Sequence, residues 1–300
     1  MPLTTQTSPF HVHSAADLPS GKKSMPVKRI HERYGLARMS PEDWAEVVAT
    51  YYGMVSRVDA HLGRVLDAVE RTGRDDRTAV LFFPDHGEYL GDYGLVEKWV
   101  AGVDPQLVHN PLLVRVPDQR PGEAGGLVEL LDVAATLYDL AGVDPGYTHF
   151  SRSLLPLVED PAASHRDAAF SEGGYQLGPE RPAEPYGFPY DLKHALEVER
   201  PELVGKVVAM RTPDWTFVSR RHDDDELYDR RADPIERVNL VADPQHAATV
   251  AELRGRMLEW LVETSDVLPP DGDPRFDADG AVMPPKGHAP PAVSSHPPAT

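Results

Sequence analysis

Asp85 and His86 are metal-ligand residue types at a place where a buried strand is predicted to end. Residues 80–83 have the length and composition of a core strand, and Pro84 stops its hydrogen-bonding ladder. In open α/β sheets, ligands bind just beyond the carboxyl ends of strands. Neighbouring residues of a regular strand point to opposite faces, so one ion can bind both side chains only if the backbone turns, as Gly87 permits. The alternative is a strand followed by a polar surface loop.

A long helical pattern precedes this strand and would position it. Ser40 is a favourable N-cap, Pro41 suits the first helical position, and Asp43 completes a variant capping box. Gly73 ends the pattern. We expect one long amphipathic helix that covers one face of a sheet and leads into a strand at 78–83 as an αβ unit. The apolar positions at helical spacing are Trp44, Val47, Val48, Tyr51, Val55, Val58, Leu62, Val65, Leu66 and Val69.

Smaller elements are predicted in the second half of the chain. The proline-punctuated residues 173–202 predict a long loop over the active-site mouth. The acidic residues 223–226 lack the glycine and the spaced ligands of a calcium loop, so they predict a solvated turn. The other expected elements are a connection at 153–167, a strand at 168–172, a hairpin of 206–211 and 215–220, a third strand ending at 227–228, and a helix at 245–263.

The motif at the predicted strand end resembles the sulfatase family of the alkaline phosphatase superfamily. In that family a strand runs into Ser-Asp-His-Gly-Glu, then Leu-Gly-Asp-His-Gly-Leu, then a lysine. This chain has the same order from Asp85 to Lys98, with Pro84 and Tyr93 as departures. Segments resembling later family motifs follow in the right order at residues 110–117, 128–143 and 226–240. The resemblance spans roughly residues 40–265 and covers only the C-terminal half of such an enzyme.

The resemblance implies an α/β fold. We expect an alkaline-phosphatase-like mixed sheet flanked by helices, incomplete in this chain, plus a small C-terminal antiparallel sheet packed with a terminal helix. The implied organisation is an irregular lead-in at 1–39, the C-terminal part of the sulfatase α/β domain at 40–200, and a small α+β subdomain at 201–265. Residues 266–300 are rich in Pro, Gly, Asp and Ala, which predicts a disordered tail.

The same resemblance implies metal-dependent cleavage of small anionic sulfate esters. Asp85 and His86 would supply half of a shell for a divalent metal, Ca²⁺ or Mn²⁺ with Mg²⁺ also open, and Lys98 would bind a sulfate oxygen. Relatives often carry a histidine that helps protonate the leaving group, for which His11 and His13 are candidates. His109 lies where some relatives place a polar residue near the substrate. An exposed surface position is the alternative for all three histidines.

The family's nucleophile motif, Cys/Ser-x-Pro-x-Arg, has no counterpart in this chain. The sequence contains no cysteine, and Ser24 to Lys28 ends in lysine where the motif needs arginine. We therefore expect a missing N-terminal half, self-association through exposed apolar edges, and no turnover by the 300-residue chain alone. Two alternatives stay open, a phosphonate monoester or phosphodiester hydrolase of the same superfamily and a non-catalytic remnant or binding module.

Composition excludes several classes of partner. The net charge is −18, from 30 basic and 48 acidic residues, and no basic cluster suits nucleic acid or an anionic membrane. No apolar stretch is long enough for a transmembrane helix. The absence of cysteine and of a secretion-signal pattern predicts a cytoplasmic protein.

Overall fold

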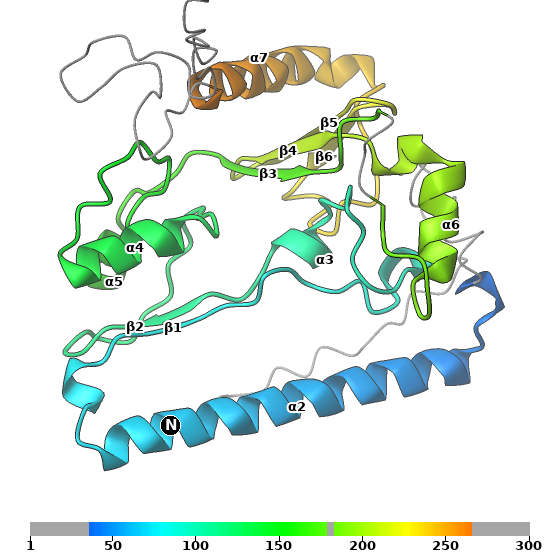
Figure 1. Ribbon diagram of the computed structural model, residues 1–300. Coiled ribbons are helices and arrows are strands. Elements are labelled where there is room, and N and C mark those ends of the chain that lie inside the picture. The colour runs from blue at the N-terminus through cyan, green and yellow to red at the C-terminus, as the bar shows by residue number, and fades with distance from the viewer. Residues whose placement is uncertain (1–35, 179–182, 266–300) are drawn as a thin grey trace, which may run out of the picture.

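A computed structural model describes residues 36–178 and 183–265. His11, His13, most of the predicted lead-in and the predicted tail lie outside these ranges. The described part has a long helix and a two-stranded sheet at one end and a four-stranded sheet covered by a helix at the other (Figure 1). No helix among the described residues combines the length and the apolar character needed to cross a membrane.

Helix α2 (Pro41–Arg71) forms as predicted, but it is not covered as predicted. The Ser40 Oγ accepts the Asp43 amide at 3.2 Å, and the Asp43 carboxylate accepts the Ser40 amide at 2.8 Å, which completes the capping box. Trp44 is its one buried residue. The expectation that α2 covers a sheet is therefore wrong for these residues, because its apolar side chains contact little of the chain. Those exposed are Tyr52, Met54, Val55, Val58 and Val65.

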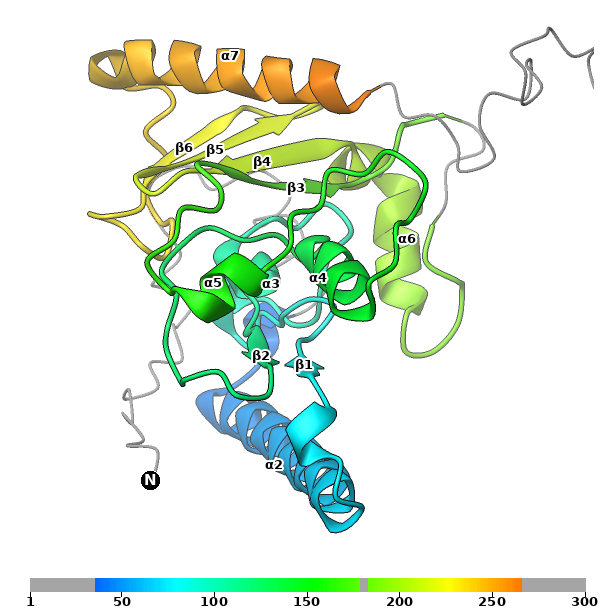
Figure 2. The ribbon, with the colours of Figure 1, turned by 90° about the vertical axis from the view of Figure 1, so that its left-hand side faces the viewer.

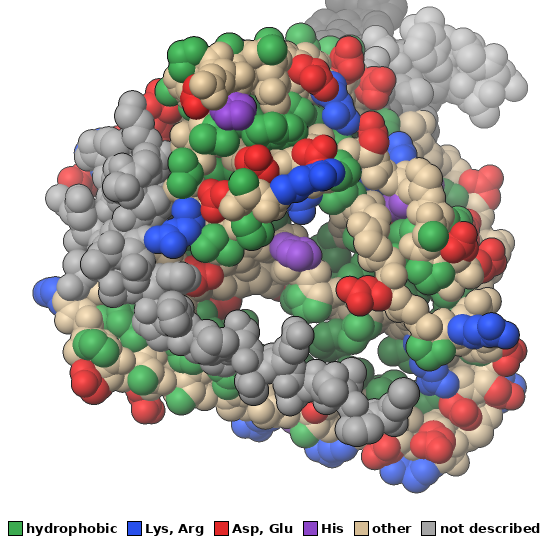
Figure 3. Space-filling view, turned by 180° about the vertical axis from the view of Figure 1, so that it is seen from behind, with side chains coloured by type: hydrophobic (Ala, Val, Ile, Leu, Met, Phe, Trp, Pro, Cys, Tyr) green, Lys and Arg blue, Asp and Glu red, His purple; other side chains and the backbone are tan. Residues whose placement is uncertain are grey.

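Strands β1 (Val80–Phe82) and β2 (Leu113–Arg115) pair antiparallel, with Leu81 opposite Val114. Each strand has a neighbour on one side only among the residues described, so the pair forms only part of the predicted mixed sheet. A groove of about 940 Å³ lies between this pair, α2 and residues 116–128, with mostly apolar side chains on its α2 and strand sides. Figure 3 shows the molecule hollowed between α2, along its lower edge, and the elements above.

The second sheet has four antiparallel strands in the order β3-β4-β5-β6. They are β3 (Ala169–Gly173), β4 (Val207–Arg211), β5 (Trp215–Arg220) and β6 (Glu226–Asp229). Helix α7 (Ala247–Thr264) covers one face of this sheet (Figure 2). Val208, Met210 and Phe217 form a buried cluster with residues of α7. The alternate residues Val207, Ala209 and Val218 pack on Ala101 and Val103. Both faces of this sheet are thus buried.

The predicted hairpin, third strand and terminal helix are confirmed, and the sheet also takes in β3. The predicted domain boundary at residue 200 stays a prediction, and this sheet draws strands from both sides of it. Short helices connect the larger elements. They are η2 (Leu36–Arg38), η3 (Asp75–Arg77), η4 (Asp92–Gly94), α3 (Pro105–Val108), α4 (Asp132–Ala141), α5 (Leu155–Glu159), α6 (Asp191–Glu199), η5 (Pro201–Val204) and η6 (Pro244–His246).

The prediction of one continuous loop at 173–202 is wrong in part, because α6 and η5 lie within it. The buried positions of α6 are Lys193, Leu196 and Glu197. These residues share one helical face, but two of them are charged, so the hydrophobic period that normally reveals a helix is absent. The connection predicted at 153–167 likewise contains the short helix α5.

Candidate active site

Asp85 and His86 converge just beyond β1. The His86 Nε2 lies 3.5 Å from the Asp85 Oδ2, and the His86 amide donates to the Asp85 Oδ1 at 3.0 Å. The His86 Nδ1 lies 2.8 Å from the Gly87 carbonyl oxygen. A carbonyl oxygen only accepts, so the neutral ring carries its proton on Nδ1 and turns the Nε2 lone pair towards Asp85. This is the tautomer that a metal-binding histidine needs.

This pair fits one side of a divalent metal shell. It offers one carboxylate oxygen and one imidazole nitrogen, and the Asp85 side chain is 86 % exposed, so a cation can reach it. Divalent ions in proteins take four or more ligands. Within residues 36–178 and 183–265, no group of three or more acidic or histidine side chains is placed to hold a metal. A metal ion held here would therefore need ligands in addition to Asp85 and His86.

Gly87 is required at this corner for a different reason from the one the sequence suggests. Its φ is not in the left-handed region. A Cβ atom at this position would lie 1.9 Å from the Gln106 carbonyl oxygen, and the Gly87 amide donates to the Leu107 carbonyl at 2.8 Å. The backbone of α3 therefore packs directly against the turn formed by Asp85 and His86, which we call the strand-end corner, and only glycine allows that approach.

The loop that leads to Lys98 is closed by one carboxylate. The Glu88 Oε1 accepts the Leu90 amide at 3.1 Å and the Glu97 amide at 2.5 Å. Both donor residues have positive φ, 47° for Leu90 and 64° for Glu97. Gly91, Tyr93 and Gly94 have positive φ as well. A loop with this many left-handed residues needs side-chain acceptors to hold it, and Glu88 supplies the acceptor at both ends.

Two tyrosines of the same loop anchor it from inside. The Tyr89 hydroxyl donates to the Asp104 carboxylate, and the Tyr93 hydroxyl donates to the Ile235 carbonyl at 2.5 Å. Burial raises the pKa of Tyr89 well above its ordinary value, and the negative charge of Asp104 adds to the rise. Tyr89 therefore remains a neutral donor. Tyr93, the departure from the family motif, joins the loop to the segment after β6.

Lys98 follows this loop with an exposed side chain. The structure brings Asp85 and His86 together, but no hydrogen bond or ion pair within the described ranges joins either of them to Lys98. The predicted anion-binding role of Lys98 therefore stays a prediction.

The backbone after Lys98 is held by donors from the C-terminal half. Four carbonyl oxygens within six residues each accept one such hydrogen bond, and we call residues 98–103 the braced segment. The contacts are Lys193 Nζ to Lys98 at 3.2 Å, the Gly174 amide to Val100 at 2.7 Å, Arg220 to Ala101 at 3.0 Å, and Arg211 to Val103 at 2.6 Å. The four-stranded sheet thereby fixes the chain between Lys98 and α3.

Arg220 is a buried donor whose charge is compensated. Its Nε donates to Glu226 at 2.5 Å, and the other carboxylate oxygen of Glu226 accepts the Tyr228 hydroxyl at 2.5 Å. Burial alone would lower the pKa of Arg220, but the charges of Glu226 and Asp104 outweigh it and raise the pKa. The arginine is therefore a permanent cation with its charge compensated. The predicted solvated turn at 223–226 is wrong for Glu226, which is buried against Arg220.

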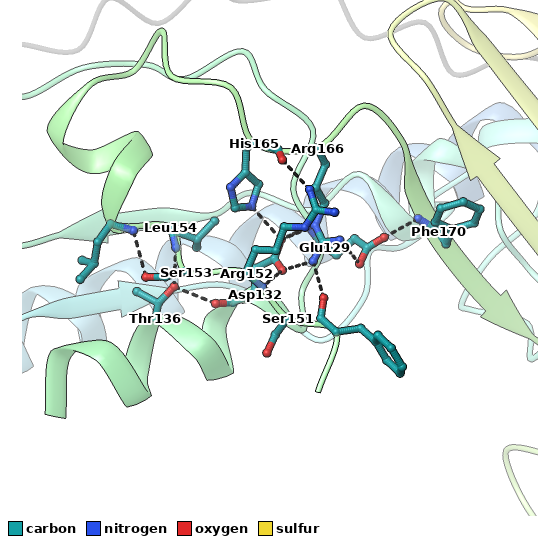
Figure 4. Close-up of polar contacts among 12 residues, drawn as sticks. Glu129, Asp132, Thr136, Ser151, Arg152, Ser153, Leu154, His165, Arg166 and Phe170 are labelled. Carbon is teal, nitrogen blue, oxygen red and sulfur yellow. Dashed lines mark hydrogen bonds and ion pairs between the residues drawn. The ribbon is translucent and has the colours of Figure 1, made fainter. Parts of the chain in front are cut away.

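A second polar cluster surrounds Asp132 at the start of α4 (Figure 4). The Asp132 carboxylate is fully buried and accepts bonds from the Arg166 guanidinium, from the His165 ring at 3.1 Å and from the Arg152 amide at 2.8 Å. Burial by itself raises the pKa of Asp132, but these bonds outweigh it and lower the pKa below its ordinary value. This saturated cluster ties α4 to residues 150–170 and leaves no lone pair turned to solvent.

The other predicted site residues are not gathered at the corner. His109 is exposed just after α3, and His11 and His13 lie outside the described residues. Sequence reasoning missed Lys193, whose ammonium group is buried although lysine is normally exposed. Its acidic neighbours Glu184 and Glu97 both lie outside α6. No local sequence pattern could therefore have revealed the burial of Lys193.

Comparison with known proteins identifies a family for this chain. Residues 8–143 match the family model described as Sulfatase. A choline-sulfatase from Rhizobium meliloti is 30% identical over 223 residues, and the multifunctional alkaline phosphatase superfamily protein PehA from Trinickia caryophylli is 27% identical over 228 residues. These matches cover 72% and 73% of this chain, and 38% and 41% of the two relatives.

Solved structures show the same fold. The phosphonate monoester hydrolase of Agrobacterium radiobacter has a TM-score of 0.62 at 26% identity, over 75% of this chain and 43% of that one. A phosphonate monoester hydrolase from Silicibacter pomeroyi has a TM-score of 0.63 at 27% identity, over 82% of this chain and 50% of that one.

The fold and the strand-end corner thus define an alkaline-phosphatase-like α/β protein. The chain belongs to the sulfatase family of the alkaline phosphatase superfamily. It spans about half or less of the length of these relatives.

Proposed function

We propose that this chain supplies one part of the active site of a sulfatase, a metal-dependent hydrolase of small anionic sulfate esters. The observation that carries the proposal is the convergence of the His86 Nε2 and the Asp85 carboxylate at 3.5 Å just past β1. Two ligand types are brought together at the strand end where the family motif has them. The relatives named as sulfatases support the choice of ester.

Each residue has a distinct task in this proposal. Asp85 and His86 hold a divalent metal ion, Ca²⁺ or Mn²⁺ with Mg²⁺ also open, and Gly87 keeps their backbone against α3. When bound, such an ion supplies positive charge that stabilises the charge developing on the ester oxygens. Lys98 binds a sulfate oxygen as a point charge. The loop closed by Glu88 sets the path of the backbone between these two parts.

The nucleophile and the other metal ligands are proposed to come from a polypeptide that packs into the groove between α2 and the β1-β2 pair. Three observations support this occupant. The groove of about 940 Å³ is lined by apolar residues such as Leu62, Leu66 and Phe82, each of the two strands has one edge without a partner among the described residues, and the exposed side of α2 is apolar. The chain also spans only 38–50% of the relatives compared above.

A phosphonate monoester or phosphodiester hydrolase is the second candidate. It is favoured by the two phosphonate monoester hydrolase structures, which match this chain above 25% identity. The strand-end corner serves either ester, since both reactions place negative charge on non-bridging oxygens. A non-catalytic binding module remains the third reading, which metal binding without turnover in the assembled protein would favour.

Metal binding by the corner tests the proposal directly. We expect Mn²⁺, followed by its electron paramagnetic resonance signal, to bind the 300-residue chain weakly and Asp85→Ala to abolish that binding. Asp139→Ala is the matched control, because Asp139 is an exposed aspartate on α4. Binding that survives in Asp85→Ala would place the metal elsewhere.

A comparison of turnover on two substrates distinguishes the sulfatase from the phosphonate monoester or phosphodiester hydrolase. The chain would be produced together with the polypeptide encoded directly upstream of it, and 4-nitrophenyl sulfate would be compared with bis(4-nitrophenyl) phosphate. A higher kcat/KM for the sulfate supports the sulfatase, and a higher value for the phosphodiester supports the second candidate. We expect the 300-residue chain by itself to hydrolyse neither, with or without Mn²⁺ or Ca²⁺.

A further inference from the structure

The backbone next to Lys98 is strained. Glu97 has a φ of 64°, although it carries a full side chain, and it directly precedes the proposed anion-binding lysine. Residues with side chains adopt this conformation rarely, and it persists only where the surroundings enforce it. The contacts that enforce this conformation therefore also fix the position of the Lys98 backbone.

Glu88 holds the peptide group between Val96 and Glu97, one residue before Lys98. Its Oε1 accepts the Glu97 amide at 2.5 Å and the Leu90 amide at 3.1 Å, and the side chain is partly buried. A carboxylate that accepts two amide hydrogens is a charge-assisted acceptor, which is stronger than a neutral one. The hydrogen bond from the Glu97 amide to Glu88 fixes the direction of that amide. It thereby also fixes the path of the backbone that leads to Lys98.

Lys193 holds the peptide group on the C-terminal side. Its Nζ donates to the Lys98 carbonyl at 3.2 Å and to the Glu184 carboxylate at 2.9 Å. The ammonium group also lies 5.2 Å from the centre of the Trp99 ring, and the residue is 2 % exposed. A lysine enclosed in this way cannot swing to solvent, so its donor has a fixed position.

We propose that Glu88 and Lys193 are a pair of positioning residues, which hold the Val96–Glu97 peptide group before Lys98 and the Lys98–Trp99 peptide group after it. The exposed Lys98 side chain is long and has no rigid support of its own, so its ammonium group is placed by its Cα atom and the direction of its backbone. Neither Glu88 nor Lys193 touches the substrate in this arrangement. The proposal rests on the proposed function, in which Lys98 binds a sulfate oxygen.

The test measures anion binding at Lys98 with inorganic sulfate as the probe. Lysines of the folded 300-residue chain are acetylated briefly with and without sulfate, and the modified fraction of Lys98 is followed by mass spectrometry. Lys206, which pairs with Glu172 at 3.0 Å, is the internal reference. The variants are Glu88→Asp, Glu88→Gln and Lys193→Met, with Arg231→Met, which removes an exposed cation paired with Asp214, as the control.

The hydrogen-bond geometry predicts opposite results for the two Glu88 variants. Glu88→Asp keeps the charge but is too short to reach both amides, whereas Glu88→Gln keeps the reach and an accepting oxygen. We expect Glu88→Asp and Lys193→Met to weaken sulfate protection of Lys98 about tenfold, which corresponds to about 1.4 kcal/mol. Glu88→Gln and Arg231→Met should stay within about twofold of the parent, a difference of only some tenths of a kcal/mol.

Three outcomes would overturn either the positioning role of Glu88 and Lys193 or the anion site at Lys98. Unchanged protection in folded Glu88→Asp and Lys193→Met overturns the positioning role. Equal loss in Glu88→Asp and Glu88→Gln overturns it too, because the effect then follows general damage to the loop. If sulfate does not protect Lys98 in the parent chain, the anion site of the proposed function fails. The pH profile of Lys98 acetylation without sulfate then decides the positioning role, which a profile identical in parent, Glu88→Asp and Lys193→Met overturns.

Discussion

Arg220 on β5 donates to the carbonyl oxygen of Ala101 at 3.0 Å, across 119 residues of sequence. The contact joins the C-terminal sheet to the braced segment that follows Lys98. The sheet is thus a mechanical support for the proposed site, and its stability and the geometry of the site are linked.

Arg220→Met should destabilise the chain strongly. Removing the guanidinium leaves the Glu226 carboxylate buried without its partner, and breaking a buried ion pair in this way typically costs about 3–5 kcal/mol. Arg231→Met, which breaks the exposed pair with Asp214, should cost less than about 1 kcal/mol. Urea unfolding of both variants gives the comparison, and equal costs would contradict the bracing role.

Gly87→Ala should weaken Mn²⁺ binding and lower the stability of the chain. The added methyl group would meet the Gln106 carbonyl, so α3 and the strand-end corner must separate. Gly63→Ala is the control, because Gly63 lies within α2 with open space around its Cβ position. That change should stabilise the helix by about 0.4–1 kcal/mol and leave Mn²⁺ binding unaltered. Intact Mn²⁺ binding in Gly87→Ala would mean that the corner tolerates the separation.

Acid should destabilise the chain partly through Asp132. Its pKa is lowered in the folded state, so the stabilisation is present above the ordinary aspartate pKa of about 3.9 and is lost as the pH falls through the lower folded value. Glu129 acts in the opposite direction, because burial raises its pKa. Asp132→Asn should therefore flatten the fall in unfolding free energy below about pH 4. An unchanged slope in this variant would show that other carboxylates govern acid unfolding.

Val58→Glu and Val65→Glu should leave the free energy of unfolding within about 0.5 kcal/mol of the parent, since both side chains are more than half exposed. We expect the same changes to reduce self-association of the chain, measured by sedimentation velocity, because they place charge on the apolar side of α2. Leu253→Ala is the contrasting variant. This buried residue of α7 should cost about 2–5 kcal/mol without changing the exposed face.

Elements with local signals could be predicted from the sequence. The capping box at Ser40 and Asp43 marks the start of α2, the turn at 212–214 marks the β4-β5 hairpin, and the apolar period marks α7. The strand-end corner could also be predicted, since Asp85 and His86 directly follow an apolar run. In each case the information lies within a few residues of the element.

Features that depend on distant contacts could not be predicted in this way. Lys193 and Glu226 are charged residues with buried side chains, and their surroundings make them part of the interior only after folding. The exposed side of α2 has the pattern of a covered helix, but pattern alone does not say which polypeptide covers it. Gly87 suggested a turn, whereas the close approach of Gln106 is what requires it.

The carboxylate of Glu88 closes a ring of backbone that runs from Glu88 to the amide of Glu97. A closed ring has a fixed circumference, so the number of residues within it is as much a part of the motif as their identities. Adding or removing one residue between Glu88 and Glu97 would open the ring, even with every proposed ligand retained. The length of this loop thus sets the distance along the chain between the proposed metal ligands and Lys98.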